Sequence, residues 1–125
     1  MTRQILDEAF IDPAIRGQVS ALHADIVAQV QAAVAANRVV VVGMAQNPFP
    51  KRARRALAAA QIAHEYLEFG SYFSQWRARN ALKMWTGWPT FPMVFVDGVL
   101  MGGASELVAQ ITSGALQKRL ASARA

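Results

Sequence analysis

The sequence of 125 residues contains no cysteine. A chain without a thiol forms no disulfide, supplies no thiolate to a metal and has no thiol nucleophile. It also lacks any apolar run of about 18 residues, which argues against a membrane-spanning helix. The opening stretch, MTRQILDEAFIDPAIRG, carries acidic side chains and no apolar centre, unlike a secretory signal. From these absences we expect a cytoplasmic protein of one domain with no thiol chemistry of its own.

Residues that bind metals or nucleic acids are also scarce. The two histidines, His23 and His64, are far apart and lack the spacing of metal ligands, so we expect no metal site. The formal net charge is +5, and basic residues concentrate in KRARR at 51–55. No tryptophan or phenylalanine lies within that run. We therefore interpret it as a solvated helix face rather than a nucleic-acid-binding surface.

Apolar residues recur every three or four positions between residues 14 and 36. They are Ile15, Val19, Leu22, Ile26, Val30 and Ala33. This period predicts one amphipathic helix over 14–36. We expect residues 1–37 to form a helical extension of a domain at 38–125. Its apolar stripe would pack on the sheet of that domain or on a second subunit in a homodimer.

The rest of the chain alternates between strand and helix patterns. VVVV at 39–42 predicts a strand buried on both faces, and Asp97-Gly98 between two apolar runs predicts a hairpin. Further helices are predicted after residue 47, over 72–85, after residue 103 and over 115–123, with a short strand within 63–70. This order predicts an α/β fold, in which a four-stranded mixed sheet has helices on both faces.

Three short motifs carry a resemblance to a known family. They are NPFP at 47–50 after the first strand, WPTFP at 88–92 before the hairpin, and MGG at 101–103 after it. Together they resemble the glutaredoxins, and most of all the monothiol glutaredoxins, over roughly residues 38–120. The resemblance implies the thioredoxin fold and a cis peptide bond between Phe91 and Pro92.

The same comparison with the family pattern shows what this chain lacks. Glutaredoxins place a nucleophilic cysteine where this chain has Asn47, and dithiol members place a second cysteine at the position of Pro50. The resemblance therefore implies no catalytic residue here. A family lysine falls at Met44, and a family acidic residue falls at Ser105. The residues left to form a glutathione or peptide groove are Asn47, Arg79, Phe91, Pro92, Gly103, Ala104 and Ser105.

These residues support two hypotheses of different classes. The leading one is a binding or regulatory module without thiol redox catalysis and without a required cofactor. Its ligand is a peptide, a partner protein or, weakly, glutathione, and Arg79 holds a carboxylate of that ligand. The alternative is an enzyme that resembles glutathione transferases, in which Asn47 stabilises the glutathione thiolate. A glutaredoxin that binds an iron–sulfur cluster needs a cysteine ligand, which this chain does not supply.

Overall fold

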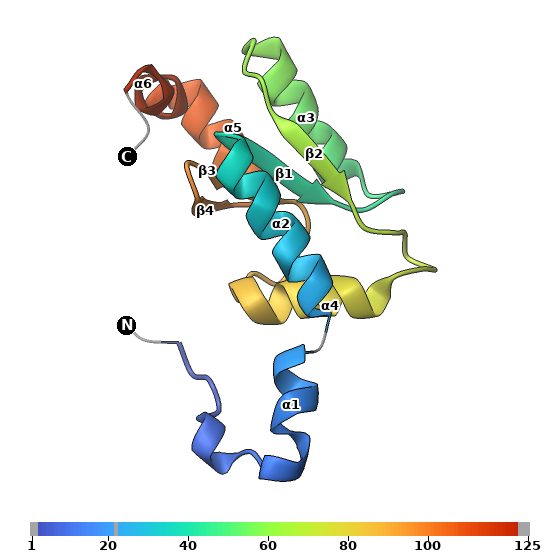
Figure 1. Cartoon of the computed structure of the whole chain (residues 1–125). Coiled ribbons are helices and arrows are strands. Elements are labelled where there is room, and N and C mark those ends of the chain that lie inside the picture. The colour runs from blue at the N-terminus through green and yellow to red at the C-terminus, as the bar shows by residue number, and fades with distance from the viewer. Residues whose placement is uncertain (1–2, 22, 123–125) are drawn as a thin grey trace.

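A computed structural model describes residues 3–21 and 23–122. Its helices and strands follow one another as Figure 1 shows. The helices are η1 (Glu8–Phe10, a 3-10 turn), α1 (Pro13–Ala21), α2 (Ala24–Ala36), α3 (Pro48–Ala59), α4 (Trp76–Thr86), α5 (Ala104–Ser113) and α6 (Ala115–Ala121). The strands are β1 (Val39–Gly43), β2 (Glu65–Glu68), β3 (Met93–Val96) and β4 (Val99–Gly102).

The four strands form one mixed sheet in the order β2-β1-β3-β4. β1 and β2 are parallel because α3 carries the chain back across the sheet, while β3 is antiparallel to both β1 and β4. The turn between β3 and β4 has positive φ at both Asp97 and Gly98, the geometry that an Asp-Gly pair favours in a two-residue hairpin. The predicted sheet and hairpin are confirmed.

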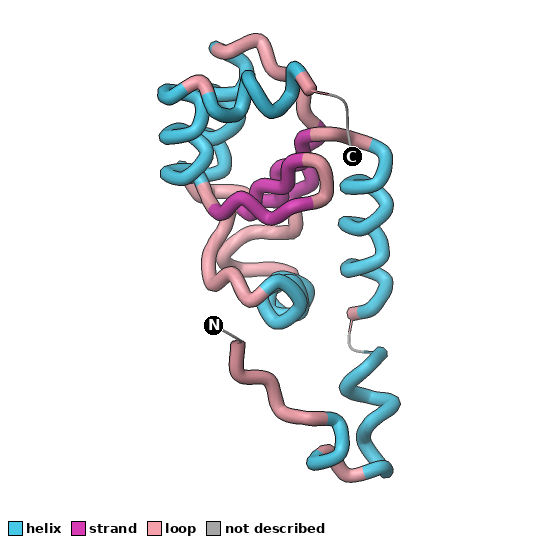
Figure 2. Tube along the Cα trace, turned by 90° about the vertical axis from the view of Figure 1, so that its left-hand side faces the viewer, coloured by secondary structure: helices cyan, strands magenta, loops and turns pink. Residues whose placement is uncertain are grey.

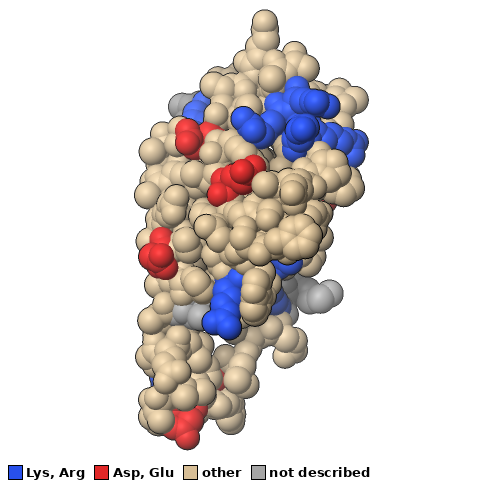
Figure 3. Space-filling view, turned by 90° about the vertical axis from the view of Figure 1, so that its right-hand side faces the viewer, with Lys and Arg blue, Asp and Glu red and all other residues tan. Residues whose placement is uncertain are grey.

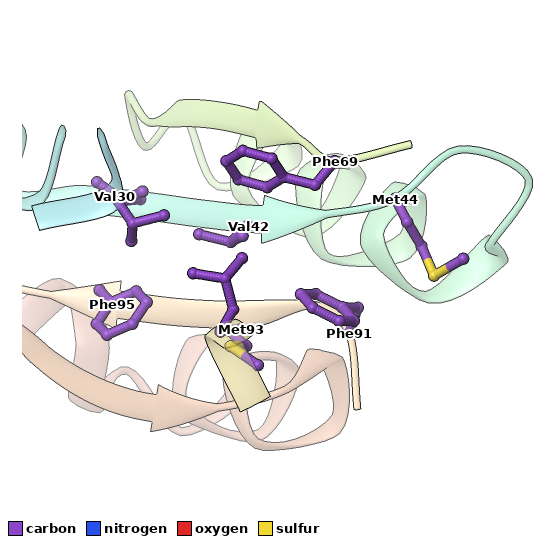
Figure 4. Packing of buried hydrophobic residues seen from close by; sticks show 9 residues of the cluster. Val30, Val42, Met44, Phe69, Phe91, Met93 and Phe95 are labelled. Carbon is purple, nitrogen blue, oxygen red and sulfur yellow. The ribbon is translucent and has the colours of Figure 1, made fainter. Parts of the chain in front are cut away.

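Helices cover both faces of this sheet, and each face has its own core. Side chains alternate along β1, so that Val40 and Val42 face the layer of α2 and α4, where Val30 and Phe95 also lie (Figure 4). Val39 and Val41 face the layer of α3, α5 and α6. The predicted burial of this strand on both faces is confirmed.

The predicted single helix over residues 14–36 is wrong, because the chain forms two helices there. α1 and α2 meet at an angle of 42°, and His23 at the break has the left-handed conformation. Helices in proteins are stabilised mainly by the packing of an apolar face, and α2 has the sheet to pack on. α1 extends beyond the sheet, so Ile15 and Val19 are exposed (Figure 2). Leu22 lies outside the described residues.

Among the described residues, no single helix is long and apolar enough to cross a membrane. The bent pair α1 and α2, taken together, passes the same test of length and composition.

A pair of matched substitutions separates the two halves of the N-terminal region. Val30 in α2 is fully buried, whereas Val19 in α1 is 52% exposed. Val30→Ala removes two buried methyl groups and leaves a cavity, so it is expected to lower the free energy of unfolding by about 2 kcal/mol. Val19→Ala is expected to change it by less than about 0.5 kcal/mol. Equilibrium unfolding in urea measures both, and equal losses would contradict this division.

Candidate functional site

A pocket of about 240 Å³ opens between the start of β3 and the start of α5, and we call it the β3–α5 pocket. Its lining consists of Phe49, Trp88, Thr90, Phe91, Pro92, Gly103, Ala104, Ser105 and Glu106. Five of the seven groove residues expected from the sequence are therefore brought together. The other two, Asn47 and Arg79, are not part of this lining.

The first wall of the pocket is the segment that leads into β3. The Phe91–Pro92 peptide bond is cis. The ring of Phe91 is buried in the same cluster as Met44 and Met93 (Figure 4). In the described part of the chain, no backbone hydrogen bond outside the helices and strands involves Phe91. Its backbone is thus available for pairing with an extended peptide, as in strand addition.

The second wall is the start of α5, where the backbone amides have no cap. Gly103 is the N-cap residue and provides no side-chain hydrogen bond. The first amides of a helix lack partners within the helix, so those of Ala104 and Ser105 are free to bind an anion. Gly102 precedes them with φ of 111°, a conformation that glycine alone adopts readily. This turn directs the start of α5 toward the pocket.

Trp88 also lines this pocket, and its indole carries an unpaired donor. Its indole Nε1 is buried and has no hydrogen-bond partner among the described residues. A Cβ added at Gly103 would lie 3.6 Å from this nitrogen and 3.4 Å from the carbonyl oxygen of Pro92. A buried donor without an acceptor costs about 1–3 kcal/mol, which a ligand acceptor would recover. The indole N–H and the α5 amides together suit a carboxylate.

The start of α3, where the family places its thiol, has the opposite character. Asn47 is the N-cap, and its Oδ1 accepts a hydrogen bond of 2.9 Å from the backbone amide of Phe49. Pro48 and Pro50 have no amide hydrogen. None of the first three positions of α3 therefore offers a free N–H to an anion.

Close packing against β1 and β2 fixes the position of this turn. A Cβ at Gly43 would come within 2.7 Å of the Pro50 ring and 2.9 Å of the Tyr66 hydroxyl, so only glycine fits between them. Burial, together with the hydrogen bond that the hydroxyl donates to Glu68, raises the pKa of Tyr66 to about 12. The guanidinium of Arg54 lies 4.1 Å from the centre of the same ring. Tyr66 is therefore a neutral packing residue over the ordinary pH range.

Arg79 does not have the exposed position that a carboxylate ligand requires. Its side chain is 7% exposed, and its Nη1 donates to the carbonyl oxygens of Phe69 and Ser74. These bonds hold the segment between β2 and α4 against the start of that helix. We expected Arg79 to bind the ligand. This expectation is corrected, because its buried guanidinium donates hydrogen bonds to backbone carbonyl oxygens instead.

Four lining residues were missed by the analysis of the sequence. They are Phe49, Trp88, Thr90 and Glu106. Trp88 and Thr90 belong to the WPTFP motif, which was the signal that could have identified them. Glu106 follows directly after Ser105, so an acidic group is still present one position beyond the expected one. It lies in the first turn of α5, where a carboxylate also interacts favourably with the helix dipole.

A larger hollow of about 650 Å³ lies at the opposite end of β1, beside Arg38, His64 and Leu120. Its most prominent polar side chain is already engaged. Arg38 forms an ion pair of 2.8 Å with Asp97, and its Nη atoms donate to the carbonyl oxygens of Leu120 and Ser122. The hydrogen bond to Asp97 raises the pKa of Arg38. Arg38 in this hollow therefore serves to join the start of β1 to the hairpin and to the end of α6.

Comparisons with known proteins agree on one family. The glutaredoxin family model matches residues 39–101. A glutaredoxin-like protein from Dictyostelium discoideum is 45% identical over 94 residues, which cover 75% of this chain and 76% of that protein. Glutaredoxin 4 from Haemophilus influenzae is 33% identical over 73 residues, which cover 58% of this chain and 65% of that protein.

Solved structures show the same fold. Oxidized glutaredoxin 2 from Chlamydomonas reinhardtii has a TM-score of 0.68 and 28% identity, with 79% of this chain and 94% of that chain covered. A buckwheat glutaredoxin–glutathione complex has a TM-score of 0.69 and 21% identity, with 81% of this chain and 92% of that chain covered. The predicted thioredoxin fold is confirmed.

The structural role of Arg79 can be tested against a neighbouring arginine. Arg79→Ala leaves two backbone carbonyl groups without their donor and is expected to lower the free energy of unfolding by about 1–3 kcal/mol. Arg77 lies in the same helix and is exposed, so Arg77→Ala should change stability by less than about 0.5 kcal/mol. Urea unfolding of both variants measures the difference. A stable Arg79→Ala variant would show that these carbonyl groups find other partners.

Proposed function

This chain belongs to the glutaredoxin family, and we propose that it acts as a binding module without thiol redox catalysis. The observation that carries the proposal is the absence of any cysteine from a chain that retains a pocket at the family's binding face. The ligand is a peptide, a segment of a partner protein or glutathione, held by a carboxylate. No cofactor takes part.

The start of α3 supports the absence of redox catalysis. A helix start lowers the pKa of a thiol through its free amides and its dipole. Asn47 replaces the thiol, and the Asn47 cap together with two prolines leaves the first three positions of α3 without a free amide. Both the nucleophile and the groups that would stabilise its anion are therefore lacking.

The β3–α5 pocket supports the binding role. A carboxylate placed there accepts hydrogen bonds from the amides of Ala104 and Ser105 and from Trp88 Nε1. Glu106 lies beside these donors and suits an ammonium group next to that carboxylate. Glutathione contains this pair of groups. With few charged contacts, the expected affinity is in about the millimolar to high-micromolar range.

The second candidate is a transferase-like activity, which one observation favours. The side-chain oxygen of Asn47 is engaged by Phe49, while its amide Nδ2 has no hydrogen bond among the described residues. An N–H donor thus remains at the position where the family holds sulfur, and it suits the thiolate of a bound glutathione.

Binding can be tested with glutathione and a matched pair of tryptophan variants. Calorimetry should give weak binding, and the indole N–H signal of Trp88 in proton–nitrogen NMR spectra should move most among the three tryptophans because it gains an acceptor. Trp88→Phe keeps an aromatic side chain but removes the donor, and it should weaken binding by about ten-fold. Trp76 is exposed and lies outside the pocket, so Trp76→Phe serves as the control. Equal affinity of both variants would contradict the assigned donor.

Catalytic activity can be tested separately from binding. With glutathione and a mixed-disulfide substrate, turnover should not exceed that of a heat-denatured control, because the chain has no thiol. Conjugation of glutathione to a chlorinated aromatic compound tests the second candidate. If wild type turns over this substrate and Asn47→Ala retains glutathione binding but loses turnover, the protein is a transferase and the proposal of a binding module is wrong.

A further inference from the structure

The N-terminal arm, defined as residues 3–21, extends away from the sheet and its helices (Figure 2). Both ends of the arm lie next to the body of the molecule. The guanidinium of Arg3 lies close to Gly87 at the end of α4, and α1 leads into α2. The tip between these two ends carries a group of exposed apolar side chains. They are Ile5, Leu6, Phe10, Ile15 and Val19.

An apolar groove lies where the arm joins the body, and we call it the α4 groove. It has a volume of about 430 Å³. Its lining comes from α1, α2 and α4 and consists of Val19, Ser20, Ala24, Val27, Gln31, Ala81, Met84 and Trp85. Met84 and Trp85 are both exposed there. The same chain thus presents a projecting apolar surface and a hollow apolar surface side by side.

The arm cannot fill its own groove in this fold. Val19 and Ser20 of the arm form one wall of the α4 groove, so the arm is part of the groove rather than its occupant. At the other end of the arm, the Arg3 side chain lies close to Gly87. The tip therefore points away from the groove of its own chain and is available to another molecule.

The arm and α4 also differ in charge. The tip carries Asp7, Glu8 and Asp12, and none of these forms an ion pair within the described residues. One basic residue of the arm, Arg16, donates to the carbonyl oxygen of Ile11. Arg77 in α4 also lacks a carboxylate partner among the described residues. In Figure 3 most basic side chains gather near the top of the molecule and a smaller group lies lower on the body, while acidic side chains lie both on the body and at the lower end. Acidic tips and a basic α4 complement each other between two copies.

We propose that this chain forms a two-fold symmetric dimer in which the arm of each copy lies in the α4 groove of the other. A two-fold interface must complement itself, and a surface that contains both a projection and a hollow satisfies this requirement. The arm and the lining of the groove together approach the roughly 20–30 residues a side that stable interfaces use. The β3–α5 pocket shares no lining residue with this surface.

The first test is the mass of the full chain in solution. Light scattering after gel filtration, or sedimentation equilibrium, should show a dimer that dissociates on dilution within about 1–100 µM. Phe10 is 79% exposed in the arm, and Phe73 is 89% exposed in the loop before α4. Phe10→Asp should give a monomer, whereas Phe73→Asp should stay dimeric. Neither side chain is buried, so circular dichroism should show both variants folded.

The second test distinguishes an exchange of arms from contact between two arms. Phe10→Asp damages the arm, and Met84→Asp damages the groove, so each variant alone should be monomeric. In a mixture, Met84→Asp supplies an intact arm and Phe10→Asp supplies an intact groove. The two variants should therefore form a heterodimer through one contact, with weaker affinity than the wild-type dimer, which has two. Contact between arms alone would leave Met84→Asp dimeric by itself, because its arm is intact, and that result would overturn the exchange.

Three results would overturn the proposal. A monomeric wild type throughout the concentration range shows that the arm does not join two copies. Dissociation by Phe73→Asp to the same extent as by Phe10→Asp places the interface elsewhere. A dimer that survives both Phe10→Asp and Met84→Asp shows that neither surface takes part.

Discussion

Burial of β1 on both faces is the constraint on which the rest of the structure depends. Its four valines are at most 2% exposed, and they alternate between the two cores, so each helical layer packs on the same strand. The pairing of Val42 with Met93 aligns the end of β1 with the start of β3. That register places the turn after β1 and the segment before β3 at the same edge of the sheet. The candidate site is built from these two segments together with the start of α5.

The starts of α3 and α5 therefore lie at the same end of the sheet, and they differ in the number of free N–H donors. α3 begins with prolines and an asparagine cap that take up or remove its amides. α5 begins after Gly103, with no side-chain cap and with the unpaired indole of Trp88 beside it. An anion gains most where free donors converge and where burial excludes water. The proposed anion site is accordingly at the start of α5, whereas thiol chemistry would have needed the start of α3.

The sequence predicted those features that are set by local pattern. Four successive valines and the Asp97-Gly98 pair each have few structural alternatives, so the sheet followed from them. The break at His23 was not predictable, because the apolar period continues across it and only the extent of the sheet decides where packing ends. The role of Arg79 was hidden for a related reason. Its partners are backbone carbonyl groups, which every residue has and no sequence pattern reveals.

The replacement at the turn after β1 involves more than the exchange of a thiol for an amide. Met44, where the family has a lysine, is buried with Phe69 and Phe91, so this wall of the groove is part of the core. The ring of Pro50 and the hydroxyl of Tyr66 in β2 both pack against Gly43. These contacts stabilise the turn by packing. On the α5 side the donors remain unpaired, and their unmet hydrogen bonds are the physical reason for expecting a ligand there rather than at Asn47.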